Sequence, residues 1–129
     1  MPNLVTTTID YVAVELRQVV YGDGLLKFAG VATVLAGTIL ARDTSDNTLI
    51  PYVIGGSTNG NGIPCAVLPN DVTSTGAGNI AIRAIISGSV NRNRLIVNAD
   101  GTGVNITKQI EDQLRARSIV PEVVDQIAS

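Results

Sequence analysis

The chain has 129 residues, of which 45% are apolar and 16% charged, and its formal net charge is −2. It contains no histidine and a single cysteine, which excludes histidine-based proton transfer and an internal disulfide. The charges form no basic cluster, which argues against nucleic-acid binding. No apolar window approaches the roughly 20 residues of a membrane-spanning helix. We therefore expect a single domain with no catalytic residue, no metal, no cofactor and no membrane partner.

The core is expected to be aliphatic, because only 3% of the residues are aromatic. Valine, isoleucine, leucine and alanine pack tightly but bury less area per residue than aromatic side chains. Cys65 lies in an apolar run and is expected to be a small core residue. The chain has more apolar side chains than a small domain readily buries, which predicts burial between subunits and hence an oligomer.

Residues 1–10 are expected to form a loose N-terminal arm, because their strand-forming threonines bring too little apolar surface to hold a fold. They lack the basic flank and apolar run of a secretory signal, which predicts synthesis in the cytoplasm. Residues 11–129 are expected to form one domain. It opens with an alternating pattern that predicts a half-buried strand over residues 9–20, ended by a turn at residues 21–24.

Short strands separated by turns are predicted through the middle of the chain. A break is expected at Gly37, and residues 43–47 are rich in side chains that bond to their own backbone, which predicts a hairpin. Pro51 removes a ladder donor and indicates a sheet edge or an irregularity. The segment Gly55–Gly62 is expected to be an exposed, flexible loop, and residues 87–89 are expected to interrupt a strand. The expected strands cover residues 25–35, 38–42, 49–54, 63–68, 79–86 and 90–97.

The hydrophobic period changes after residue 103. Ile106, Ile110 and Leu114 recur every four residues and so lie along one stripe of a helix. Asn105 or Thr107 can cap the start of this helix.

The end of the helix is predicted from charge and proline. Glu111 and Arg115 are spaced for a surface pair, and Pro121 is expected to stop the helix and to open a second, short helical turn over residues 122–127. The predicted fold is therefore mainly β with a short C-terminal α-helix.

Three local motifs have functional interpretations that we reject. The segment Gly55–Gly62 lacks the lysine and the following helix of a phosphate-binding loop. Residues 98–103 resemble half of a calcium loop, but they hold one carboxylate and are followed by Gln109 where a bidentate glutamate belongs. Residues 105–107 match a glycosylation acceptor, yet helix capping explains the same side chains.

Two carboxylate pairs are candidates for acid and base chemistry, namely Asp43 with Asp46 and Glu111 with Asp112. Each pair is expected in a polar turn or on a solvated helix face, where nothing would shift a pKa. We therefore predict that the protein is not an enzyme.

The order and spacing of several segments resemble the lambda-type phage head decoration proteins, also called capsid cement or stabilisation proteins. The resemblance covers about residues 30–120, and the chain departs from the bacteriophage lambda protein in lacking tryptophan and in its longer C-terminal tail. The matching segments are residues 37–43, Pro51–Tyr52, residues 63–68 with residues 70–72, residues 80–90 followed by Asn91 and Leu95, and a C-terminal helix over residues 106–119.

The resemblance implies a small, tulip-like β-barrel that assembles into a homotrimer. Its implied partner is the major capsid protein, which it would bind and stabilise on the outer surface of the expanded virion head, at local three-fold positions. The threonine-rich arm suits this role, since an extended segment can add a strand to a sheet edge of a partner. The expected capsid-binding residues are Asn3, Leu4, Val5, Thr6, Thr7, Thr8 and Ile9.

Two other functions stay open at this point. Another phage structural module, such as a tail or baseplate connector, would assemble with a different symmetry. A trimeric β-rich nucleotide hydrolase would need paired carboxylates in a glycine-framed motif, which the sequence lacks.

Overall fold

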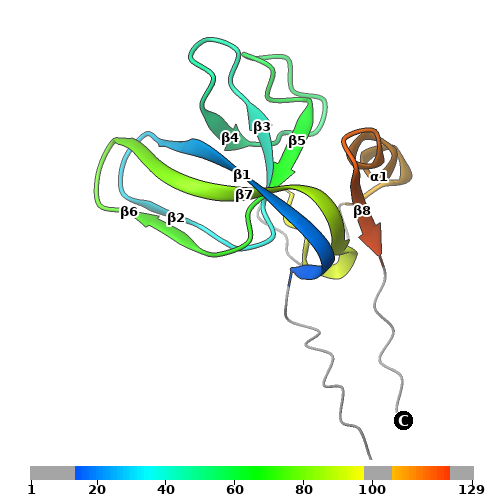
Figure 1. Cartoon of the computed structure of the whole chain (residues 1–129). Helices are drawn as coiled ribbons and strands as arrows, with labels where there is room; N and C mark the ends of the chain where they lie inside the picture. Colours follow the sequence, from blue (N-terminus) through cyan, green and yellow to red (C-terminus); the bar gives the residue numbers. More distant parts are fainter. Residues whose placement is uncertain (1–13, 98–105, 123–129) are drawn as a thin grey trace, which may run out of the picture.

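The computed structural model describes residues 14–97 and 106–122, and these residues are mainly β (Figure 1). They contain one α-helix, α1 (Lys108–Arg115), and one 3-10 helix, η1 (Arg92–Arg94). The predicted class, mainly β with a short C-terminal helix, is confirmed. The strands are β1 (Glu15–Phe28), β2 (Ala32–Val34), β3 (Ile39–Arg42), β4 (Leu49–Pro51), β5 (Pro64–Val67), β6 (Val72–Ser74), β7 (Gly78–Asn91) and β8 (Ile119–Glu122).

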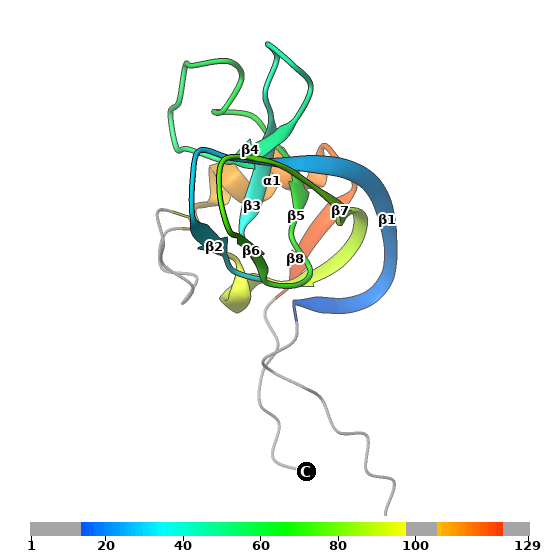
Figure 2. The ribbon, with the colours of Figure 1, turned by 90° about the vertical axis from the view of Figure 1, so that its left-hand side faces the viewer.

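Five of the strands close into a small barrel. β1 and β7 form a long antiparallel ribbon that runs from Glu15 opposite Val90 to Phe28 opposite Gly78. From β1 the sheet continues through β4, β3 and β5 back to β7. Closure pairs the strands on both sides and removes exposed edges from this part of the sheet. The barrel implied by the resemblance is therefore confirmed, and Figure 2 shows β1 curving around one side of it.

The turn expected at residues 21–24 is wrong, because β1 continues through both glycines of that segment. A Cβ atom on Gly22 would lie 3.0 Å from the side chain of Ile86, and one on Gly24 would lie 2.8 Å from that of Leu49. These glycines make room for apolar neighbours inside a strand. Sequence pattern alone does not distinguish this use of glycine from a turn.

Residues 87–89 do not interrupt β7 either, although the ribbon is irregular there. Gly88 has a φ of +112°, and a Cβ atom on it would lie 2.5 Å from the carbonyl oxygen of Gln18. On the facing strand the pairing register shifts between Arg17 and Val20, as at a β-bulge. A bulge increases the local twist, so the ribbon bends here without ending.

The separate strand expected over residues 90–97 is wrong. β7 ends at Asn91, whose side-chain oxygen accepts a hydrogen bond of 3.1 Å from the backbone N–H of Asn93 at the start of η1. The chain rejoins the sheet only at Ile96, which bridges to Thr38. A side chain that caps a helical turn thus stops the long strand.

The strand expected over residues 25–35 is divided in two. β1 ends at Phe28, and β2 instead pairs with β6 in a separate two-stranded sheet. This small sheet lies beside one end of the β1 and β7 ribbon (Figures 1 and 2). β6 was not predicted, because its three residues are too few to establish an alternation.

The hairpin expected at residues 43–47 is confirmed, since β3 and β4 pair antiparallel on either side of it. Gly55–Gly62 lies outside strands and helices, as predicted, and β5 confirms the strand that follows. β4 is an interior strand and not an edge, because it lies between β1 and β3. It ends at Pro51, however, so the missing N–H falls where the ladder stops.

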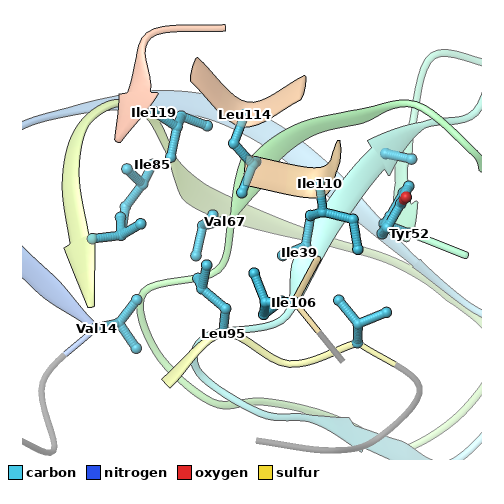
Figure 3. Packing of buried hydrophobic residues seen from close by; sticks show 13 residues of the cluster. Val14, Ile39, Tyr52, Val67, Ile85, Leu95, Ile106, Ile110, Leu114 and Ile119 are labelled. Atoms are coloured by element: carbon cyan, nitrogen blue, oxygen red, sulfur yellow. The ribbon is translucent and has the colours of Figure 1, made fainter. Parts of the chain in front are cut away.

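The structure contains two apolar clusters where one core was expected. The first fills the barrel and consists of Leu26, Phe28, Leu40, Leu49, Ala66, Leu68 and Ala84. The second lies between the outside of the barrel and α1 (Figure 3) and consists of Val14, Ile39, Ala41, Tyr52, Val67, Ile85, Val90, Leu95, Val97, Ile106, Ile110, Leu114 and Ile119. Both clusters are dominated by aliphatic side chains, as predicted. Two clusters form because β3 is apolar on both faces, one turned into the barrel and the other towards α1.

The predicted helical stripe is confirmed for Ile110 and Leu114, which lie on α1 and are buried in the second cluster. Ile106 is buried in the same cluster but precedes α1 and its N-cap. Thr107 is the N-cap, and its hydroxyl oxygen accepts a hydrogen bond of 3.2 Å from the N–H of Ile110. The helical role expected for Pro121 is wrong, because Pro121 and Glu122 lie in a strand, and residues 123–127 of the expected helical turn lie outside the described residues. After α1 the chain turns through Ser118, which has a φ of 66°, and enters β8, where Pro121 pairs with β7.

Candidate functional site

The seven capsid-binding residues expected on the arm, Asn3 to Ile9, lie outside the described residues. The first residue that the structure describes is Val14. Val14 is buried, and its carbonyl oxygen accepts a hydrogen bond of 2.8 Å from the N–H of Asn91. Val14 is therefore packed and hydrogen-bonded on the barrel.

The ends of β1 and β8 are joined beside the end of β7. Arg17 Nη2 lies 2.5 Å from Glu122 Oε1, and β8 pairs with the last residues of β7. Hydrogen bonds from Ser89 and Arg17 hold the pKa of Glu122 below its ordinary value. The start of β1 and the end of β8 thus lie on the same side of the barrel (Figure 1).

The expectation that nothing would shift the pKa values of Asp43 and Asp46 is wrong. Lys27 Nζ lies 2.7 Å from a carboxylate oxygen of each. Hydrogen bonding to Lys27, aided by Thr48, lowers the pKa of Asp46 from 3.8 to about 2, and Lys27 with Ser45 likewise lowers that of Asp43. Both groups are held as carboxylates that bind a lysine, which suits a structural role and not proton donation.

Glu111 was expected on a solvated helix face, and this expectation is wrong. Glu111 is only 3% exposed, and its carboxylate lies 3.2 Å from Arg92 Nε and 3.7 Å from Arg115 Nη2. Arg92 also donates a hydrogen bond of 2.6 Å to the carbonyl oxygen of Ile106. This cluster ties η1 to α1, while Asp112 points to solvent with 78% of its side chain exposed.

A hollow of about 480 Å³ lies on the barrel surface between β3, β5, β7 and the turn after α1. Its lining includes the side chains of Arg42 and Arg117, which are far apart in the sequence and were not predicted to meet. Cys65 also lines it and is only half-buried, so the expected core position is confirmed only in part. Burial raises the pKa of the Cys65 thiol, and the positive charges of the two arginines oppose that rise.

Several large apolar side chains are exposed on the described surface, and the most exposed is Val31 at 78%. The others are Val20, Leu25, Leu35, Val53, Ile54, Ile63, Ile86 and Val120. Exposed apolar surface of this kind favours burial against another protein. Among residues 14–97 and 106–122, no cluster of three or more metal-ligating side chains occurs, and no helix is long and apolar enough to cross a membrane.

The closed barrel and its exposed apolar side chains define a small β-rich protein with surface suited to contact another protein. The family model of the bacteriophage lambda head decoration protein D matches residues 14–119. The chain therefore belongs to this family of phage head decoration proteins. No curated protein matches it.

Membership in the family confirms the resemblance seen in the sequence and extends it to β1. The protein is a structural component of the virion with a capsid decoration role, and its place is on the phage capsid.

Proposed function

We propose that the chain binds the major capsid protein as a homotrimer, at local three-fold positions on the outer surface of the expanded head, and stabilises the shell. The observation that carries this proposal is the family match over residues 14–119. The exposed apolar side chains of the barrel support self-association. No catalytic step is part of the proposal, and synthesis takes place in the host cytoplasm.

The proposed contact with the shell is the N-terminal arm, residues 1–10, with Asn3 to Ile9 as its binding residues and residues 11–129 as the single β-rich domain. An extended segment gains affinity by adding its backbone hydrogen bonds to a sheet edge of the partner. The packing and hydrogen bond of Val14 support this arrangement, because they hold the chain on the barrel a few residues after the proposed arm.

Three arms on one trimer would bind far more tightly than one. Linked contacts gain roughly a hundred-fold or more in avidity when the geometry allows simultaneous engagement. A protein that binds only the expanded shell stabilises that state by mass action, without any chemical step.

The proposal is tested with purified protein and mature shells. Light scattering should give three times the mass of one chain, and bound protein should raise the temperature at which shells lose integrity. Deleting residues 1–10 should leave the trimer intact and strongly weaken shell binding. A monomer, or full binding by the truncated chain, would refute the trimer or the arm mechanism respectively.

A further inference from the structure

The hollow between β3, β5 and β7 has the chemistry of a carboxylate site. Arg42 and Arg117 line it, together with Cys65 and the exposed side chains of Ile63 and Ile86. A guanidinium group presents several N–H donors in a plane and binds carboxylates through paired hydrogen bonds.

Neither arginine is neutralised within the part of the chain that the structure describes. Arg42 Nη1 donates a hydrogen bond of 2.8 Å to the carbonyl oxygen of Asn47, which holds it in place without balancing its charge. Arg117 forms no ion pair with another described residue. Both positive charges act on Cys65, so they reach the same point in the hollow.

The rest of the lining is mostly apolar, with Ile63, Cys65 and Ile86 beside Thr44 and Gly60. Ile63 is 57% exposed and Ile86 42% exposed, although both are large aliphatic side chains. A ligand that covers them while it reaches the arginines needs a carboxylate next to an apolar group. An acidic protein side chain with an apolar neighbour meets this requirement, whereas a free inorganic anion does not cover the isoleucines.

The acidic side chains of a second copy are poor candidates for this ligand, because most of those described already have internal partners. Asp43 and Asp46 bind Lys27, Glu111 lies beside Arg92, and Glu122 pairs with Arg17. Asp23, Asp71 and Asp112 are also exposed. Asp71 accepts a hydrogen bond of 2.7 Å from the N–H of Ala36, and Asp112 lies 3.8 Å from Arg115 Nη1. This leaves Asp23 as the exposed carboxylate without a bonded partner among the described residues.

We propose that the hollow lined by Arg42 and Arg117 binds an acidic side chain of the shell protein, with an apolar neighbour of that side chain covering Ile63 and Ile86. This inference rests on the proposed function, and it adds a second contact to that of the arm. The contact is electrostatic and therefore sensitive to salt, unlike the backbone hydrogen bonds of an added strand.

The charge of the hollow is tested first without shells, through Cys65, the only cysteine of the chain. The alkylation rates of its thiol with anionic iodoacetate and neutral iodoacetamide are compared in the full-length protein. In the double variant Arg42→Gln/Arg117→Gln, the iodoacetate-to-iodoacetamide rate ratio should fall roughly fivefold. Arg83 lies over the Tyr21 ring, on the same barrel but outside the hollow. The control Arg83→Gln removes its charge and should leave the rate ratio unchanged. An equal ratio in wild type and double variant would overturn the anion site.

Shell binding of the same proteins then tests the ligand. The double variant should bind mature shells at least tenfold more weakly and with less dependence on salt, while Arg83→Gln stays within about twofold of wild type. Circular dichroism and light scattering establish that each variant keeps its fold and its oligomeric state. Unchanged shell affinity in the double variant would overturn the inference while leaving the proposed function intact. Wild-type protein that does not bind shells would overturn both the inference and the proposed function. Loss of the oligomer in the double variant would instead assign the carboxylate to a second copy of the chain, and Asp23→Asn should then cause the same loss.

Discussion

Single glycines have different roles in this chain, and their surroundings decide which. Gly22 and Gly24 admit neighbouring side chains within a strand, whereas Gly37 lies at a true break between β2 and β3 with a φ of +95°. A Cβ atom on Gly37 would lie 1.9 Å from the carbonyl oxygen of Arg94. Both the backbone conformation and the space therefore require glycine at this position.

Gly37→Ala should consequently lower the free energy of unfolding by about 2–4 kcal/mol. Urea denaturation at one fixed protein concentration measures the change. Gly30→Ala is the matched control, because nothing lies within 4 Å of its Cβ position and its φ is not in the left-handed region. The control should change stability by less than about 1 kcal/mol. Equal effects of the two substitutions would contradict the packing described around Gly37.

The pair of aspartates at Lys27 predicts a dependence of stability on pH. The pKa of Asp46 is lowered from 3.8 to about 2 in the folded protein, and that of Asp43 is lowered as well. A lowered folded-state pKa contributes stability above the unfolded value, and this contribution is lost as the pH falls from about 4 to about 2. Lys27→Met should therefore destabilise the protein at pH 7 and make its stability fall less between about pH 4 and about pH 2.

Urea denaturation midpoints of wild type and Lys27→Met at pH 2.5, 4.5 and 7 measure this difference. Lys108→Met is the control at an exposed lysine. Parallel pH profiles of wild type and Lys27→Met would rule the explanation out.

The secondary-structure elements follow from the sequence where a local pattern is long or the turn chemistry is specific. The stripe of Ile106, Ile110 and Leu114 predicted α1, and residues 43–47 predicted the β3 and β4 hairpin. Elements were misjudged where tertiary contacts override local signals. Pro121 lies in β8 because β7 supplies a parallel neighbour, a contact that no local pattern shows.

The arm is proposed to act as an added strand, which predicts a dependence on its backbone N–H groups. In a strand, successive N–H groups point to opposite sides, so the double variant Thr6→Pro/Thr7→Pro removes a ladder donor whichever side faces the shell. Shell affinity should fall at least tenfold. Thr6→Val/Thr7→Val keeps both donors and the tendency to form a strand, so it should bind within about threefold of wild type. If the valine variant loses as much affinity as the proline variant, the side chains and not the backbone provide the contact.

At the scale of the whole molecule, a small aliphatic core and exposed apolar side chains argue for association. Nine large apolar side chains are exposed on the described surface, while the two clusters contain few aromatic residues. Such a domain gains stability by burying surface against copies of itself.

Association predicts that thermal stability depends on protein concentration. A trimer that dissociates when it unfolds should show a melting midpoint that rises over a hundred-fold increase in concentration. Differential scanning fluorimetry or calorimetry at several concentrations measures this shift. A midpoint independent of concentration would point to a monomer, provided that unfolding is reversible.

The sequence by itself determined the mainly β class, the aliphatic core, the capped C-terminal helix and the family resemblance. Each of these depends on composition, on periodicity or on the order of short segments, which are properties of neighbouring residues. Only the tertiary structure decided that β1 and β7 run through their glycines, that the barrel closes, and that Arg42 and Arg117 line one hollow. These features depend on contacts between residues distant in the chain, and such contacts leave no periodic signal in a single sequence.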